Sequence, residues 1–292
     1  MNKTRLDVLL FERGFAESRE RARAIIMSGN VFVAGNRAEK PGAQVDREIP
    51  IEVRGVKDYV SRGGKKLEKA LKAFGVTPEG KVCIDCGAST GGFTDCLLKN
   101  GARLVFAVDV GYGQLAWSIR SDQRVITMER TNIRHATPEM FEPKPELAVI
   151  DLSFISLGLV LPVVRSFLQA DGEALCLIKP QFEAGREKVG KKGVVRDPDT
   201  HKEVLDAFVN NSGRSGFAVR GLTHSPLRGP EGNIEYLGWL VCGKQNGNSE
   251  FGIRNSELID VDARCTAVCG KLMDEGIDSL AVVREAHEEF GL

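Results

Sequence analysis

Apolar segments of strand length recur between residues 82 and 179, and helical patterns lie between several of them. The strand candidates cover residues 82–86, 104–109, 125–129, 147–151 and 175–179, and a helix over residues 61–74 precedes the first. This alternation is typical of a doubly wound α/β fold with a mostly parallel sheet, in which ligands bind beyond the carboxyl ends of the strands. Two later strand candidates, 218–222 and 236–241, are expected to form an antiparallel edge of this sheet.

The N-terminal part of the chain predicts a separate small α+β unit. Thr4 followed by Asp7 suggests a capped helix that ends near Gly14, and Ser18 is the expected N-cap of a second helix that ends before Gly29. Strands are expected from Val31 to Val33 and over residues 49–53, with a turn at residues 35–36. Arg19 and Arg23 would share one exposed side of the second helix, either as a solvated face or as contacts to an acidic partner.

Charge is distributed unevenly along the 292 residues, although 40 basic and 40 acidic residues cancel overall. Residues 245–292 contain 4 basic and 10 acidic residues, so residues 1–244 carry 36 minus 30, or +6, and the tail carries −6. We therefore expect three parts: a small domain at 1–57, the α/β domain at 58–244, and an acidic extension of unknown role at 245–292. The excess of positive charge permits, without requiring, binding to an acidic polymer.

The cysteines and the hydropathy of the sequence indicate the cellular compartment that suits the protein. The 7 cysteines are odd in number and scattered, which argues against a disulfide framework and fits a reducing cytoplasm. A zinc site from Cys83, Cys86, Cys265 and Cys269 is a weak alternative, because the first pair lies in an apolar strand pattern; no metal is expected. No signal peptide or membrane span is indicated, and the oligomeric state is left open.

A glycine-rich loop directly follows the first strand of the α/β domain and opens the next helix. It runs from Asp85 to Thr94, where glycines allow a ligand to approach the backbone closely. Asp109 closes the second strand, where a carboxylate can accept hydrogen bonds from the ribose of an adenosine. Asn132, just past the third strand, is placed to meet the adenine. The spacing is not the G-x-G-x-x-G of dinucleotide-binding enzymes.

Six blocks in this order resemble the hemolysin-A-like (TlyA) ribosomal RNA methyltransferases, whose catalytic part is FtsJ-like. They lie at residues 60–67, 85–94, 151–157, 178–183, 193–197 and 232–235, within a resemblance that covers about residues 4–243. The first unit, over about residues 4–53, is similar to the small RNA-binding domain named after ribosomal protein S4. The resemblance implies methyl transfer from S-adenosylmethionine to a ribose 2'-hydroxyl of ribosomal RNA, on cytidine, with ribosomal RNA or ribosomal subunits as partners in the cytoplasm.

The resemblance also implies the residues of the site. A catalytic Lys-Asp-Lys-Glu tetrad would consist of Lys66, Asp151, Lys179 and Glu235. The residues expected at the cofactor are Asp85, Gly87, Ser89, Gly91, Gly92, Phe93, Thr94, Asp109, Asn132 and Asp151. Those expected at the RNA are Arg5, Arg19, Arg21, Arg23 and Arg62.

Lys179 ends an apolar strand, so it is expected to be partly desolvated. It could either take the proton of the attacking hydroxyl or stay charged and stabilise the developing alkoxide, and the sequence does not separate these roles. Lys66 has the alternative of an ordinary solvated helix lysine, because other lysines surround it.

Three alternative functions are left open by the sequence. A nicotinamide-dependent oxidoreductase would use the same fold and the acid at Asp109, although the loop spacing disfavours it. A non-catalytic RNA-binding or ribosome-assembly factor would need only the N-terminal unit. A membrane-lytic hemolysin is disfavoured by the lack of long apolar or strongly amphipathic basic segments.

Overall fold

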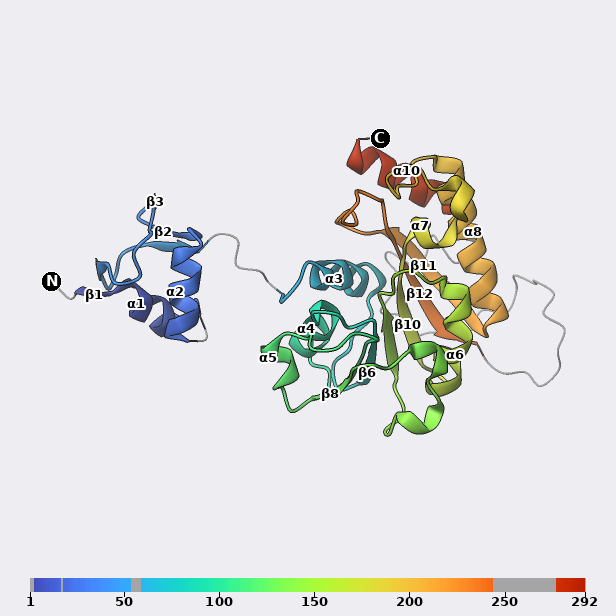
Figure 1. The fold of residues 1–292 in the computed structure, drawn as a ribbon, viewed down its shortest axis with the longest axis horizontal. Coiled ribbons are helices and arrows are strands. Elements are labelled where there is room, and N and C mark those ends of the chain that lie inside the picture. The colour runs from blue at the N-terminus through green and yellow to red at the C-terminus, as the bar shows by residue number, and fades with distance from the viewer. Residues whose placement is uncertain (1–2, 17, 54–58, 244–276, 292) are drawn as a thin grey trace. The chain divides into compact units, whose positions relative to one another are not determined.

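The computed structural model describes residues 3–16, 18–53, 59–243 and 277–291, and the chain separates into two compact units, Met1–Asp58 and Tyr59–Leu292 (Figure 1). Each unit has its own apolar core. Residues 245–276, which include Cys265, Cys269 and the expected helical pattern around Leu272, lie outside the described residues.

The described residues of the first unit form two helices and five short strands. Their bounds are β1 Lys3–Arg5, α1 Leu6–Glu12, α2 Arg19–Met27, β2 Val31–Val33, β3 Asn36–Arg37, β4 Gln44–Asp46 and β5 Ile51–Val53. Strands β3, β2 and β5 form one antiparallel sheet, while β1 pairs with β4 in a second. Leu6, Leu10 and Ile26 are fully buried between the helices and the strands.

Two details of this unit correct the sequence interpretation. Thr4 does not cap α1, because it lies in β1 and pairs with Val45; the N-cap is Arg5, which has no capping side-chain hydrogen bond. The β-turn falls at Ala34 and Gly35, both with positive φ, and Asn36 already belongs to β3. The cap at Ser18 is confirmed, since its side chain accepts a hydrogen bond from the backbone N–H of Arg21.

The second unit is built on a seven-stranded sheet in the order β11-β12-β10-β9-β6-β7-β8. The strands are β6 Val82–Cys86, β7 Leu104–Val108, β8 Val125–Met128, β9 Leu147–Ile150, β10 Glu173–Ile178, β11 Phe217–His224 and β12 Tyr236–Cys242. All neighbouring pairs from β10 to β8 are parallel, whereas β12 runs antiparallel to both β10 and β11. This confirms the mostly parallel sheet with an antiparallel edge.

Helices cover both faces of this sheet (Figure 1). They are α3 Gly63–Phe74, α4 Gly92–Lys99, α5 Trp117–Arg120, α6 Leu161–Phe167, α7 Pro180–Glu183, α8 Pro198–Arg214 and α10 Ser279–Phe290. Successive residues of β9 alternate between two core clusters: Leu147 and Val149 face α3 and α4, while Ala148 and Ile150 face α6 and α8. Burial on both faces explains why these strands are continuous apolar runs in the sequence.

Helix α3 begins at Gly63, two residues later than expected. Helix α10 lies within the segment expected to be an acidic extension, and it packs against α8 and β11. Within the described part of the chain, no helix is long and apolar enough to cross a membrane.

Candidate active site

The glycine loop between β6 and α4 is anchored to both strands that flank β6. The backbone N–H groups of Gly87 and Ala88 donate to the carbonyl of Val108 in β7. Gly87 has a φ of 97°, and a side chain there would collide with the backbone carbonyl of Asp151, which follows β9. Glycine is therefore required at this position both for its backbone conformation and for close approach to the neighbouring chain.

A cavity of about 1110 Å³ opens beyond the carboxyl ends of β6, β7 and β9. Its lining includes Gly87, Ser89, Asp109, Asn132 and Asp151, which brings together five of the residues predicted to bind the cofactor. A cavity of this size holds a ligand as large as an adenosine derivative. Its position is where doubly wound folds bind their ligands.

Asp109 is held in a fixed orientation at this cavity. Its carboxylate accepts hydrogen bonds from the backbone N–H of Ser89, at 2.8 Å, and of Gly111, at 2.6 Å. A carboxylate has further lone pairs and can accept from ligand hydroxyls at the same time. The side chain of Asn132 accepts a hydrogen bond from the N–H of Arg134, so it also shapes the turn at residues 133–135.

Asp85 and Thr94 do not line this cavity. Both side chains are fully buried beneath the loop, where the Thr94 hydroxyl donates to Asp85 at 2.6 Å. Burial raises the pKa of Asp85 to about 7, opposed by the hydrogen bond from Thr94. These two residues support the loop from below.

A smaller recess of about 210 Å³ shares Gly87, Ser89 and Asp151 with the large cavity. It is also lined by Arg62, Lys66, Gly92 and Phe93. Gly91 has a φ of 95° and forms the N-cap of α4 behind this recess. The two spaces therefore meet at Asp151, beside the residues of the predicted tetrad.

The four tetrad residues come together as two ion pairs at the edge of the sheet. Lys179 lies 2.6 Å from the Asp151 carboxylate, and Lys66 forms a short ion pair with Glu235. Sheet topology brings them there: Asp151 and Lys179 follow the parallel strands β9 and β10, and antiparallel β12 begins with Tyr236 opposite Ile178. The residue before β12, Glu235, is thereby placed beside the residue after β10.

These charged groups are largely withdrawn from water. The side-chain exposures of Lys66, Glu235 and Lys179 are 10%, 1% and 11%. Lys66 is thus not an ordinary solvated helix lysine. Burial raises the pKa of Glu235, while the ammonium groups of Lys66 and Lys179 act to lower it and Asp151 acts to raise it. The two pairs therefore form a single electrostatic cluster.

Several residues that the sequence analysis did not single out support this cluster. Ser153 accepts a hydrogen bond from Lys179 at 3.0 Å. The buried amide of Asn233 bonds to the backbone of Gly193 and Val195, which fixes the turn that leads to Glu235. Gly193 and Asn233 belong to two separate sequence blocks. The hydrogen bond between them, which joins the two blocks in space, could not be predicted from the sequence.

Phe154 and Gln181 are two further residues at the large cavity. The Phe154 side chain is 90% exposed, has a positive φ of 65°, and lies 5.0 Å from the Phe182 ring between centroids. A positive φ at a non-glycine residue and a largely exposed aromatic ring are both uncommon, so Phe154 is a candidate for contact with a ligand. The buried amide oxygen of Gln181 has no hydrogen-bond partner among the described residues, so the cavity offers an unmatched acceptor to a ligand.

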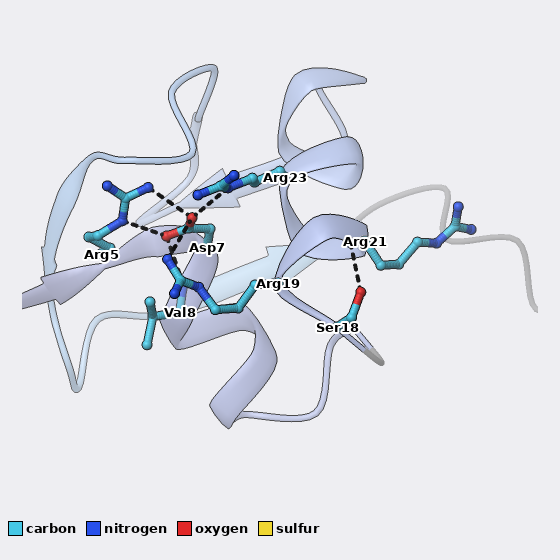
Figure 2. Close-up of polar contacts among 7 residues, drawn as sticks. All are labelled: Arg5, Asp7, Val8, Ser18, Arg19, Arg21 and Arg23. Atoms are coloured by element: carbon cyan, nitrogen blue, oxygen red, sulfur yellow. Dashed lines mark hydrogen bonds and ion pairs between the residues drawn. The ribbon is translucent and has the colours of Figure 1, made fainter.

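The predicted RNA-binding arginines of the first unit also have defined positions. Arg5, Arg19 and Arg23 surround the buried carboxylate of Asp7, whereas the Arg21 side chain points away from it (Figure 2). Arg62 is exposed and lies at the N-terminus of α3, in the second unit.

The fold and this site define a class: an S-adenosylmethionine-dependent methyltransferase that carries a small RNA-binding domain. A family model of FtsJ-like methyltransferases matches residues 59–242, and a model of the S4 domain matches residues 4–48. S-adenosylmethionine is the methyl donor of FtsJ-like enzymes. The chain belongs to the TlyA/hemolysin A family of FtsJ-like methyltransferases.

Curated relatives agree with this placement over most of their length. The 16S/23S rRNA (cytidine-2'-O)-methyltransferase TlyA of Mycobacterium tuberculosis is 45% identical over 87% of this chain and 96% of its own. Hemolysin A of Brachyspira hyodysenteriae is 42% identical over 81% of this chain and 99% of its own. A solved structure from Streptococcus thermophilus, whose name places it among the hemolysins, shares 42% identity with a TM-score of 0.69 and covers 100% of this chain and 98% of that one.

The residues of the large cavity fit the methyl donor. The unmatched amide oxygen of Gln181 and the fixed carboxylate of Asp109 are acceptors for the polar groups of an adenosyl amino acid. Asp151 stands where the cavity meets the tetrad, so it can contact the amino-acid part of the donor and Lys179 together.

Proposed function

We propose that this protein transfers a methyl group from S-adenosylmethionine to the ribose 2'-hydroxyl of cytidine in ribosomal RNA. The observation that carries this proposal is the pair of lysine–carboxylate ion pairs beside the large cavity. The M. tuberculosis relative, named for 16S/23S cytidine-2'-O methylation, supports the choice of substrate. Ribosomal RNA in ribosomal subunits would be the partner, and the cytoplasm the place of action.

The tetrad would act on the hydroxyl of the RNA. S-adenosylmethionine supplies an electrophilic methyl group on a positively charged sulfur. The bond between the ribose oxygen and the methyl carbon would form as the bond from that carbon to sulfur breaks, so that the demethylated donor leaves as a neutral thioether. The hydroxyl proton would pass to water, and negative charge develops on the oxygen as the proton departs. A lysine ammonium held nearby stabilises this charge at little reorganisation cost, because its ion pair already fixes it.

The contacts of Lys179 hold its side chain in a defined position at the edge of the sheet. Its ammonium group faces Asp151 at 2.6 Å and donates to Ser153 at 3.0 Å, so both contacts fix where the nitrogen lies. We infer that Lys179 acts as a fixed cation that orients the hydroxyl oxygen. Asp151 and Glu235 would hold Lys179 and Lys66 in place.

Phe154 would position the target nucleotide. Its exposed ring lies beside Phe182, whose own ring centroid is 6.0 Å from the Lys179 nitrogen, and bases that leave a helix stack on such rings. Arg62 at the small recess would contact the adjacent RNA backbone. In this arrangement the ribose enters from the recess, while the donor occupies the larger cavity.

The direct test is methyl transfer by purified protein from S-adenosylmethionine to isolated ribosomal subunits, followed by nucleoside mass spectrometry. The expected product is 2'-O-methylcytidine. On fragmentation in the mass spectrometer it loses a methylated ribose and leaves an unmodified cytosine base. A methyl group retained on the base would contradict ribose chemistry. Binding of NAD instead of S-adenosylmethionine in calorimetry would contradict the cofactor assignment.

A further inference from the structure

Asp7, in the first turn of α1, is a fully buried carboxylate surrounded by three arginines (Figure 2). Arg5 donates to both of its oxygens, at 3.0 and 2.9 Å, and Arg23 donates to one at 3.0 Å. Arg19 lies 3.5 Å from the same oxygen. One acidic side chain thus joins arginines from β1 and from α2.

This cluster has a net positive charge of three minus one, or +2. The hydrogen bond from Arg5 holds the pKa of Asp7 well below its usual range against the opposing effect of burial, and Arg23 adds to this. The carboxylate therefore stays ionised. A single carboxylate would have been balanced by one arginine, so two positive charges are in excess at this place on the surface.

The three arginines are ordered, yet they remain available to a ligand. Their side-chain exposures are 42% for Arg5, 46% for Arg19 and 48% for Arg23. A guanidinium has more N–H donors than these contacts use, and its planar fork matches the oxygens of a phosphate group. Holding such long side chains in place before binding lowers the entropy lost when a ligand binds.

We propose that Asp7 is a positioning residue that holds Arg5, Arg19 and Arg23 as a preformed site for phosphate groups of structured RNA. This inference rests on the proposed function, in which ribosomal RNA is the substrate. It adds that the geometry of the three guanidiniums, and not charge alone, determines affinity. The acidic residue would then strengthen binding to an acidic polymer.

Arg21 provides an internal control in the same helix. It lies two residues from both Arg19 and Arg23 and is exposed, but its side chain points away from Asp7 (Figure 2). Its backbone N–H bonds to the capping side chain of Ser18. A change at Arg21 alters the same kind of side chain without touching the cluster.

The first comparison is Arg23→Lys against Arg21→Lys in the full-length protein. Both variants keep the net charge, but lysine cannot reproduce the contact that the Arg23 Nε makes with Asp7. Binding to rRNA transcribed in vitro would be measured by filter retention at several salt concentrations. Arg23→Lys should weaken binding roughly 2- to 10-fold, and Arg21→Lys should weaken it by a smaller factor, because only Arg23 contacts Asp7.

The second comparison is Asp7→Asn against Glu20→Gln. For Asp7→Asn, the positioning role and the change in net charge predict opposite changes in RNA affinity. Both variants remove one negative charge and so raise the net charge of the first unit by one. Glu20 is an exposed residue of α2. Attraction between net charges alone would tighten RNA binding by both variants. The positioning role predicts weaker binding by Asp7→Asn only. Circular dichroism checks that the Asp7→Asn variant is folded. If it is not folded, the comparison of Arg23→Lys with Arg21→Lys tests the positioning role instead.

Equal affinities for the two lysine variants, or tighter RNA binding by folded Asp7→Asn, would overturn the positioning role. Methyl transfer to ribosomal subunits by the wild-type protein is measured on the same preparation. RNA binding without methyl transfer would overturn the proposed function alone. Wild-type protein that binds no rRNA would overturn both.

Discussion

Two lysines and two carboxylates lie at the sheet edge with little access to water, and each lysine faces a carboxylate. A buried charge is tolerated when it is paired and hydrogen-bonded. Removing one partner leaves the other uncompensated, so changes at these four residues affect local structure as well as charge. Variants that keep the charge are therefore more informative than alanine alone.

Replacement of Lys179 tests the role of its charge. Lys179→Ala should lower single-turnover methyl transfer ~10²–10⁴-fold while leaving S-adenosylmethionine affinity near wild type. Lys179→Arg keeps a permanent cation and should retain a measurable part of the rate, because the wild-type lysine is ion-paired with Asp151. Rates measured across pH for the three proteins separate a fixed cation from a base. An alanine variant with the wild-type rate would remove Lys179 from the active site.

Asp85 predicts a pH dependence of stability. Its pKa is raised from 3.8 to about 7, so the folded state keeps a proton that the unfolded state has lost between these values. The unfolded state binds fewer protons there, and the stability contributed by this group must fall as pH rises from about 4 to about 7.

Asp85→Asn removes this titration while keeping an acceptor for Thr94. The free energy of unfolding of wild type minus that of the variant should fall by up to ~1.4 kcal/mol per pH unit across the window. Denaturant titrations at several pH values measure this difference. A difference that does not vary between pH 4 and 7 would contradict the assignment.

Sequence position predicted some of these residues and not others. Asp109, Asp151 and Lys179 follow apolar strands, and parallel strand ends meet at one edge of a sheet, so their convergence was predictable. The contact of Arg19 and Arg23 with Asp7 was not, because helical spacing shows which face two residues share but not what packs against it.

Among the elements of the second unit, the glycine loop connects the large cavity to the tetrad. Gly87 approaches the backbone of Asp151, and Ser89 orients Asp109, so the loop touches both strands that flank β6. Its shape thereby controls the positions of the Asp151 and Asp109 carboxylates.

Gly87→Ala should disturb both positions. The added Cβ would collide with the Asp151 carbonyl, and the φ of 97° is itself unfavourable for alanine. We expect S-adenosylmethionine affinity to fall at least ~10-fold by calorimetry, since a backbone clash costs more than the ~1–2 kcal/mol of a left-handed residue. Gly80→Ala is the matched control, because Gly80 also has a positive φ of 70° but has nothing within 4 Å of the added atom. Equal affinities in the two variants would show that loop contact does not matter.

The strands of the second unit were predicted to within two residues of most ends, because they are apolar on both faces and bounded by loops. The short strands β1 and β4 were missed, since their pairing joins Thr4 to Val45 across the unit and neither strand has a marked apolar pattern. The same pairing explains why the capped helix expected at Thr4 was wrong: the backbone there is committed to a strand.

At the scale of the whole molecule, the chain divides into two compact units with different surfaces. The arginine cluster lies in Met1–Asp58, and the tetrad lies in Tyr59–Leu292. We propose that the first unit supplies RNA affinity and the second the chemistry. Helix α10, within the segment expected to be an acidic extension, packs on α8 and β11 of the second unit.

Charge reversal of Arg19 and Arg23 to Glu tests this division of labour. The variant should bind RNA more weakly and with a flatter salt dependence, because fewer phosphate contacts release fewer counterions. Its S-adenosylmethionine affinity should equal that of wild type, as measured by calorimetry. Unchanged RNA binding would make this helix face an ordinary solvated surface.

A mass-spectrometric map of ribose methylation in ribosomal RNA would show whether the protein acts as proposed in the cell. It would compare cells that carry the wild-type gene, cells that lack it, and cells that carry Lys179→Ala. We expect 2'-O-methylcytidine at one or more positions in the cells with the wild-type gene only. An identical map in all three would contradict the assignment of this protein as a ribosomal RNA ribose methyltransferase.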